Sequence, residues 1–275
     1  MGALTRTRRD MTQTTRQERR ARFAIAGATV VLLVCALIEA WIVLSSVSPS
    51  DGTIGLDLHF YQANTTSWLA GDGFYRAGQL AGPYVVADGD AMYPPTVLLL
   101  LVPFTVGVPA VLWWAIPLGI AAATIVWVRP ARWAWPVLLA IFVYHRTWMI
   151  LVFGNPAMWA LAALSVGAVW RWPAALAVLK LTFAPFALLG VRDRRWWLTA
   201  AVLVAVSVPF GAMWIDFAHV LLWAQSPHGF EYTLGEWPIA IALLVVVRSG
   251  TRPRRSIGRG APAQVVPASP LVQGP

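Results

Sequence analysis

Long apolar runs separated by short breaks of Arg, Pro, Gly and Asn dominate the pattern of this 275-residue chain. The first run, residues 23–47, is interrupted only by Glu39 and a few Ser and Thr. Because a signal-peptide core has only about 7–15 apolar residues, this run predicts an uncleaved transmembrane helix. Seven further spans are predicted at about 94–108, 110–128, 134–152, 156–170, 173–190, 196–214 and 237–247. The pattern therefore predicts an all-α, polytopic membrane bundle of about eight helices, and the short second and last runs leave seven or nine as alternatives.

Basic residues cluster at the chain ends and predict the orientation of the bundle. Seven Arg fall in residues 1–22 and five in residues 248–259. Because Lys and Arg concentrate on the cytoplasmic side of membrane proteins, both termini are predicted to be cytoplasmic in a multi-pass protein of the plasma membrane. With eight spans the cluster 192–195 is also inside, and the basic residues left outside are Arg76, Arg129, Arg132 and Arg171.

This division predicts three parts of the chain. Residues 1–22 form a basic cytoplasmic N-terminus, and residues 23–248 form the membrane domain. Residues 249–275 are rich in Pro, Gly and Arg with little to bury, and they predict a disordered cytoplasmic tail.

The composition excludes a soluble globular domain. The chain is 58% hydrophobic, and charged residues make up 12% of it, about half of the roughly 25% usual in soluble proteins. The net charge of +9 flanks the spans, where it attracts membrane lipids, and no nucleic-acid-binding motif accompanies it. Nucleic acid is therefore not an expected partner. Cys35 is alone, so no disulfide framework is expected.

The loop between the first two spans, residues 48–92, is acidic. Five of the twelve carboxylates of the chain lie there, with Arg76 as the one basic residue; they are Asp51, Asp57, Asp72, Asp88 and Asp90. This charge has the wrong sign for the cytoplasmic side, so the loop is predicted to be extracytoplasmic. It places carboxylates near the bilayer surface, where one could act on a lipid-borne substrate.

Asp57 has two interpretations that do not exclude each other. Leu58, Tyr61, Trp68 and Leu69 recur at near-helical spacing, which predicts a short helix lying in the membrane interface with its apolar face down. Asp57 could be the N-cap of this helix. It could instead be a general base that takes the proton of an acceptor hydroxyl while that oxygen attacks a sugar carbon.

Lys180 is the one lysine of the chain, and it lies within an otherwise apolar span. An ammonium at that depth is costly and usually faces a polar cavity or a partner. One interpretation is a lysine that reaches the interface or pairs with Glu39. The other is a counter-charge for a lipid phosphate.

Further polar residues interrupt the apolar runs. His145 and Arg146 lie within the predicted fourth span, and Arg can bind a phosphate with two parallel hydrogen bonds. The alternative is that the helix breaks there and Arg146 is interfacial. Asn155, between Gly154 and Pro156, predicts a helix cap. The late carboxylates and histidines, Glu231, Glu236, His219 and His228, match no metal motif, so no metal site is expected.

Four segments, in this order, carry a resemblance to a known family. They are residues 55–61 (GLDLHFY), residues 69–75 (LAGDGFY), residues 93–104 from Tyr-Pro-Pro to Pro-Phe, and Gly154-Asn155 followed by Leu179-Lys180. Together they resemble the polyprenyl-phosphate-mannose-dependent mannosyltransferases of glycosyltransferase family 87, which have the GT-C membrane fold. The resemblance covers roughly residues 23–215.

The resemblance implies a catalytic base, a donor and a set of contacts. Asp57 is the implied base, and the implied donor is a polyprenyl-phosphate sugar reached from the extracytoplasmic side, with a glycolipid or glycan as acceptor and no cofactor. The candidate substrate-binding residues are His59, Tyr61, Tyr93, His145, Arg146, Asn155 and Lys180.

Two departures from the family keep other functions open. Asn155 stands where the family has Gln, and members have more spans beyond this point. A non-catalytic homologue that assembles with another membrane protein is therefore one alternative. A transporter or flippase of a lipid-linked sugar, which would use the same intramembrane cations, is the other.

Overall fold

The computed structural model describes residues 2–48, 52–225 and 234–250. Within these residues the protein is helical, apart from one short parallel pair formed by β1 (Tyr84–Val85) and β2 (Ala224–Gln225), so the all-α prediction is confirmed. The predictions for Asp51, His228 and Glu231, and for the tail beyond residue 250, lie outside the described residues.

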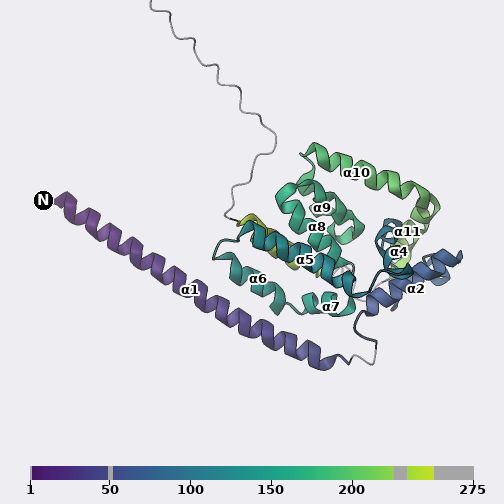
Figure 1. Ribbon diagram of the computed structural model, residues 1–275, viewed down its shortest axis with the longest axis horizontal. Coiled ribbons are helices and arrows are strands. Elements are labelled where there is room, and N and C mark those ends of the chain that lie inside the picture. The colour runs from purple at the N-terminus through teal and green to yellow at the C-terminus, as the bar shows by residue number, and fades with distance from the viewer. Residues whose placement is uncertain (1, 49–51, 226–233, 251–275) are drawn as a thin grey trace, which may run out of the picture.

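The elements follow the predicted apolar runs, with several differences in length (Figure 1). In chain order the helices are α1 (Gly2–Ser46), α2 (Leu56–Ala70), α3 (Ala77–Leu80), η2 (Pro95–Val97), α4 (Leu98–Val106), α5 (Val111–Val128), α6 (Ala134–Val143), α7 (His145–Phe153), α8 (Ala157–Trp170), η3 (Trp172–Leu179), η4 (Leu181–Phe183), α9 (Ala184–Ala187), η5 (Leu188–Gly190), α10 (Arg194–Ser207), η6 (Val208–Phe210), α11 (Gly211–Trp223) and α13 (Trp237–Arg248).

Three stretches of the described chain are helical, apolar and long enough to cross a membrane: Gln17–Ser46, Val111–Val128 and Arg194–Trp223. Helices α6 and α7 make a fourth if they are taken as one span, bent by 64° at Tyr144. This break agrees with the alternative in which the helix is interrupted at His145 and Arg146. Three other predicted spans correspond to shorter apolar helices, Pro95–Val106, Ala157–Trp170 and Trp237–Arg248, and only the second half of the span 173–190 does so, as Leu181–Gly190.

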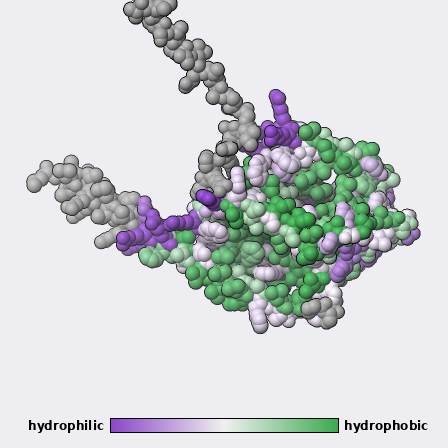
Figure 2. All heavy atoms as spheres, viewed as in Figure 1, coloured by the Kyte–Doolittle hydropathy of each residue, from purple (hydrophilic) through white to green (hydrophobic). Residues whose placement is uncertain are grey.

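Hydrophobic side chains cover much of the outer surface. Large apolar residues are exposed along α1 and along α10 and α11, among them Trp41, Ile42, Leu198, Val204 and Leu222. Figure 2 shows hydrophobic residues over most of the face in view. Such a surface is unfavourable in water and suits lipid, so the fold is consistent with a membrane protein.

Helix α2 forms as predicted, but it packs against protein. Leu58 and Tyr61 are buried in the core, where α2 contacts α4 and α7. The prediction of an interfacial helix with its apolar face toward lipid is therefore wrong for these two residues. The N-cap is Gly55, whose φ of 77° suits glycine, and Asp57 is the second helical residue. The N-cap prediction for Asp57 is thus wrong as well.

Buried polar contacts order the loop after α2. Gln79 is buried and donates to the carbonyl of Ala91 at 3.1 Å, and the Tyr75 hydroxyl donates to the carbonyl of Tyr93 at 2.8 Å. Arg76 pairs with Asp90 at 3.6 Å. Together these contacts fix the chain that leads into Tyr93.

Several helix ends meet at one end of the bundle, which we call the basic end (residues 128–134, 170–172, 190–196 and 247–250). The Ala131 amide donates to the Ser249 hydroxyl at 3.3 Å, and the Trp127 and Trp170 rings lie 5.1 Å apart. A Cβ on Gly190 would lie 2.3 Å from the Arg171 carbonyl oxygen, so residues 171 and 190 are adjacent.

The opposite end of the bundle gathers the start of α5, the end of α7 and the start of α2. The Trp113 indole donates to the carbonyl of Gly154 at 2.7 Å, and the Gly55 amide donates to the carbonyl of Val152 at 2.8 Å. Helix α5 therefore begins at this end. Tyr93, which precedes α4, contacts Asn155 at the same end, so α4 does not run to the basic end and back.

Residues 171–190 form a hairpin. The chain leaves the basic end at Arg171, continues through η3 to Lys180, and returns through η4, α9 and η5 to Gly190. The predicted sixth span is thus not one α-helix, because it reverses direction at Lys180, whose backbone is extended (φ −123°, ψ 111°).

These two segments contradict the strict alternation of eight spans. Alternation places Arg129, Arg132 and Arg171 on the side opposite to residues 192–195, whereas the fold gathers all of them at the basic end. It also separates Asn155 from the acidic first loop, whereas the two are in contact, as described below.

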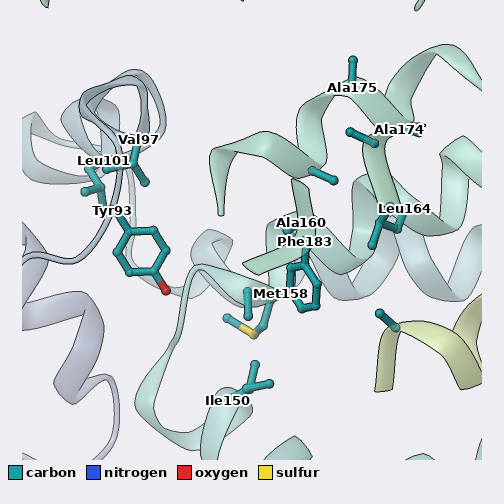
Figure 3. Close-up of a cluster of buried hydrophobic side chains, with 14 of the residues drawn as sticks. Tyr93, Val97, Leu101, Ile150, Met158, Ala160, Leu164, Ala174, Ala175 and Phe183 are labelled. Atoms are coloured by element: carbon teal, nitrogen blue, oxygen red, sulfur yellow. The ribbon is translucent and has the colours of Figure 1, made fainter. Parts of the chain in front are cut away.

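The core lies around α8, which is buried between α5, α13 and η3. Figure 3 shows part of it, with Met158 and Phe183 side by side and the Tyr93 ring directed toward them. Gly167 allows the closest approach, since a Cβ there would lie 2.7 Å from the Ala174 amide nitrogen. This packing holds the hairpin against α8 and so sets the position of Lys180.

Candidate functional site

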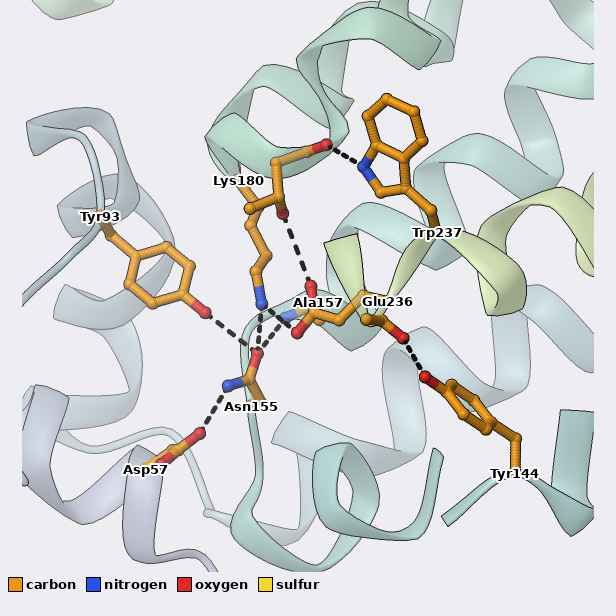
Figure 4. A network of polar contacts seen from close by, with 10 residues as sticks. Asp57, Tyr93, Tyr144, Asn155, Ala157, Lys180, Glu236 and Trp237 are labelled. Carbon is orange, nitrogen blue, oxygen red and sulfur yellow. Dashed lines mark hydrogen bonds and ion pairs between the residues drawn. The ribbon is translucent and has the colours of Figure 1, made fainter. Parts of the chain in front are cut away.

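Asn155 is the centre of a buried polar cluster (Figure 4). It lies in the turn between α7 and α8, where Gly154 (φ 69°) reverses the chain. Its Oδ1 accepts hydrogen bonds from the Tyr93 hydroxyl at 3.0 Å, from Lys180 Nζ at 3.0 Å and from the Ala157 amide at 2.9 Å. Because the Ala157 bond satisfies an amide of the first turn of α8, Asn155 also has the predicted capping role.

Asp57 meets Asn155 from the side of the outer loop. Asn155 Nδ2 donates to Asp57 Oδ2 at 2.5 Å. Burial raises the pKa of the Asp57 carboxyl above its usual range, and the Asn155 hydrogen bond and the Lys180 ammonium offset part of this rise. A carboxylate with a raised pKa and a fixed orientation is suited to take up a proton.

Lys180 reaches the cluster from the tip of the hairpin. Its Nζ donates to Glu236 Oε1 at 2.5 Å, and the two side chains are 12% and 11% exposed. The prediction that Glu39 is the protein partner available to Lys180 is therefore wrong. Glu236, the N-cap residue of α13, is that partner, and it is also within 3.5 Å of the Thr182 hydroxyl.

Glu236 belongs to this cluster, although in the sequence it was considered only as a possible metal ligand. It stands directly before the apolar run 237–247. A lone lysine in an apolar run needs a counter-charge, and a carboxylate at the start of another apolar run is a candidate for it. That signal was available, but it did not separate Glu236 from Glu39.

Aromatic rings form one wall of the cluster. The Tyr93 ring lies 5.5 Å from Lys180 Nζ, and the Phe183 ring lies 5.9 Å from it. Tyr61 packs edge-on against Tyr93, with ring centroids 5.0 Å apart. The predicted contacts Tyr61 and Tyr93 are thus part of the same site, and their rings lower the polarity around the charges.

Two predicted contacts lie elsewhere. His145 pairs with Glu39 of α1 at 2.6 Å, and its side chain is 61% exposed. His59 is exposed on α2 and takes no part in the hydrogen bonds of the cluster among the described residues. Arg146 follows His145 in α7 and is half-buried.

Within the described residues, no group of three or more His, Cys, Asp or Glu side chains is arranged to hold a metal ion. Among the described residues, the hydrogen-bonded groups of the cluster are the carboxylates of Asp57 and Glu236, the Lys180 ammonium, the Asn155 amide, the Tyr93 phenol and the Thr182 hydroxyl. Comparison with protein-family models, with curated proteins and with solved structures found no match for this chain.

Proposed function

We propose that the protein is a membrane glycosyltransferase that moves a hexose, mannose by resemblance, from a polyprenyl-phosphate sugar to a glycolipid or glycan acceptor on the extracytoplasmic side. The observation that carries this proposal is the arrangement around Asn155. A carboxylate with a raised pKa lies on one side of its amide, and an ammonium lies on the other. Transfer from a sugar phosphate needs these two groups, a base for the acceptor and a cation for the leaving phosphate.

The residues have distinct roles in the proposed reaction. Asp57 takes the proton of the acceptor hydroxyl as that oxygen forms a bond to the anomeric carbon. The bond between the anomeric carbon and the phosphate oxygen breaks, and the phosphate leaves with the electron pair. Lys180 stabilises the charge on this phosphate, and the effect is large because the surroundings are apolar.

Asn155 positions both groups in this scheme. Its amide hydrogen fixes one Asp57 oxygen, and its carbonyl oxygen fixes the ammonium of Lys180. Among the described residues no hydrogen bond is made to the other Asp57 oxygen, Oδ1, which is therefore the atom we assign to the acceptor proton.

The membrane arrangement that best fits this function has six crossings: α1, α5, the bent pair α6–α7, α8, α10–α11 and α13. The hairpin 171–190 then enters and leaves on the cytoplasmic side, and both termini are cytoplasmic. This arrangement gathers Arg129, Arg132 and Arg171 with the other basic residues, which satisfies the positive-inside rule better than eight spans.

The same arrangement sets the depth of the site. Helix α8 has 14 residues, so Asn155 lies roughly 21 Å from the basic end. The hydrocarbon core is about 30 Å thick, which places the cluster in the outer half of the bilayer, beneath α2 and α4. A lipid phosphate entering from the outer leaflet would have a short path to Lys180.

Cysteine labelling separates six crossings from eight. In a Cys35→Ser background, Arg132→Cys should resist an impermeant maleimide in intact cells and react after permeabilisation. Asp88→Cys, in the outer loop, is the matched control and should react in intact cells. Labelling of Arg132→Cys in intact cells would restore the eight-span arrangement.

The enzymatic proposal is tested with membranes that contain the protein and a radiolabelled polyprenyl-phosphate mannose. Asp57→Asn should abolish transfer while the donor still binds, because the amide keeps the shape of the carboxylate but cannot take a proton. Turnover within a few-fold of the original protein would refute the assignment of Asp57.

A transporter or flippase of the same lipid is the second candidate, because the Lys180–Glu236 pair and the broken helices α6–α7 and 171–190 are features of transport sites. In that case Asp57→Asn would leave no chemical defect to measure, since the sugar would stay on its lipid. A non-catalytic homologue would neither transfer the sugar to an acceptor nor move the lipid across the membrane.

A further inference from the structure

Glu236 is held in place by its neighbours in the chain. The carbonyl of Gly235 accepts a hydrogen bond from the Tyr144 hydroxyl at 2.7 Å, and the Trp237 indole donates to the carbonyl of Thr182 at 2.8 Å. The backbone on both sides of Glu236 is thus tied to α6–α7 and to the hairpin. The side chain of Glu236 can therefore leave Lys180 by rotation about its own bonds, with these backbone contacts kept.

The contacts of that side chain are unequal. Oε1 makes the 2.5 Å ion pair with Lys180, whereas Oε2 is 3.5 Å from the Thr182 hydroxyl, at the limit of a hydrogen bond. Lys180 is therefore the main partner that keeps the carboxylate in the cluster. In the absence of another anion, this pair avoids an uncompensated ammonium in an apolar site.

A phosphate bound to Lys180 would conflict with Glu236. It would approach the same nitrogen, and it would put a second negative charge beside the carboxylate, which the low-polarity surroundings make costly. The two anions would share the charge of one ammonium, so a bound phosphate weakens the ion pair between Lys180 and Glu236.

We propose that Glu236 is a positioning residue that occupies Lys180 in the resting protein and is displaced when a lipid phosphate binds. This inference rests on the proposed function, because it takes Lys180 as the phosphate contact. After sugar transfer, the return of the Glu236 carboxylate to Lys180 expels the polyprenyl phosphate product. The carboxylate lowers the affinity of the site for phosphate and thereby speeds its release.

Glu236→Gln should then bind the product more tightly and release it more slowly. The amide has nearly the shape of the carboxylate but neither pairs with Lys180 as an anion nor repels phosphate. We expect the Kd for a polyprenyl phosphate to fall about tenfold. In steady-state transfer, KM for the donor and kcat should both fall, which a purely structural defect would not produce.

The test is a double-mutant cycle on the full-length protein in lipid nanodiscs, with polyprenyl monophosphate as the probe and tryptophan fluorescence as the readout. The four proteins are the original chain, Glu236→Gln, Lys180→Met and the double variant. The gain from Glu236→Gln should be smaller in the Lys180→Met background, because competition for the ammonium is lost there and only the direct repulsion between the two anions remains.

Two further variants keep the test decisive. Glu39→Gln removes the other carboxylate that forms an ion pair within the apolar helices, with His145, and should leave the Kd unchanged. Glu236→Asp keeps the charge on a shorter side chain, so its Kd should lie between those of the original protein and Glu236→Gln.

The outcomes separate the two proposals. If Lys180→Met binds polyprenyl phosphate as well as the original protein, the phosphate assignment of Lys180 fails, and the proposed function fails with it. If Lys180→Met binds weakly but Glu236→Gln binds no more tightly than the original protein, the displacement of Glu236 is refuted while the proposed function stands.

Discussion

Replacing Asn155 by alanine removes the side chain that joins Asp57, Lys180 and Tyr93 to the start of α8. Four hydrogen bonds of 2.5–3.0 Å are lost in one substitution. With alanine at this position, the Asp57 carboxylate and the Lys180 ammonium would each lose one hydrogen-bond partner. The polar cluster would then lose its order, although the apolar packing around it would remain.

The size of this effect follows from the partners. A capping bond such as that to Ala157 contributes about 1 kcal/mol, and a hydrogen bond to a charged group contributes about 1.5–3 kcal/mol. Asn155 makes two bonds of the second kind, to Asp57 and Lys180. Because the bonds share one side chain they do not add fully, and we expect a loss of about 4 kcal/mol.

The assay is thermal unfolding of the purified protein in detergent, followed by tryptophan fluorescence. A loss of this size corresponds to a decrease in Tm of roughly 10 °C for a domain of this length. The matched control is Asn64→Ala, a buried asparagine that donates to the carbonyl of Gly89 at 3.0 Å. If Asn155→Ala lowers Tm no more than Asn64→Ala does, Asn155 does not hold the cluster together.

Two further predictions concern stability. Burial raises the pKa of the Asp57 carboxyl above 3.8 in the folded protein, so the stability that this carboxyl contributes is present below pH 3.8 and is lost as the pH rises through the folded-state pKa. Asp57→Asn should therefore raise Tm at pH 7, and the difference in Tm should shrink toward pH 4. A lower Tm for Asp57→Asn at pH 7 would contradict this prediction. Gly167→Ala should lower the free energy of unfolding by about 1–3 kcal/mol, because the added Cβ would overlap Ala174 of the hairpin. The control Gly119→Ala lies in a helix with open space around it and should not destabilise the protein. Equal Tm values for the two variants would refute the close contact at Gly167.

The sequence identified most of the site but not the contacts within it. Asp57, Tyr93, Asn155 and Lys180 were candidates, and the fold brings these four side chains into one hydrogen-bonded cluster. They are separated by up to 123 positions along the chain, so their pairing depends on how the helices pack. Periodicity within a run carries no information on that packing.

Glu236 illustrates the same limit. Both Glu39 and Glu236 lie within or beside apolar runs, and either could have neutralised Lys180. Helix α1 packs against α6 and α7, so Glu39 pairs with His145 and Lys180 pairs with Glu236. A pairing between distant helices is a property of the bundle, and composition alone does not determine it.

The predicted alternation of spans failed for a different reason. Hydropathy measures whether a segment is apolar, but a segment of 12–18 apolar residues can cross a membrane, pack beneath a loop or reverse direction. Residues 94–108 pack against α2, and residues 173–190 turn back at Lys180. The basic residues at 129, 132 and 171 were the sequence signal against alternation, because eight spans placed them outside.

The central claim is that the sugar changes its covalent partner at this site, and the chemical fate of a radiolabelled donor tests it most directly. Purified protein in liposomes is given polyprenyl-phosphate mannose, labelled in the sugar, together with a glycan acceptor. The account predicts that the label moves to the acceptor as polyprenyl phosphate is released, and that Asp57→Asn stops both events. Label that stays on the polyprenyl phosphate and only changes leaflet would contradict the account and identify a lipid transporter.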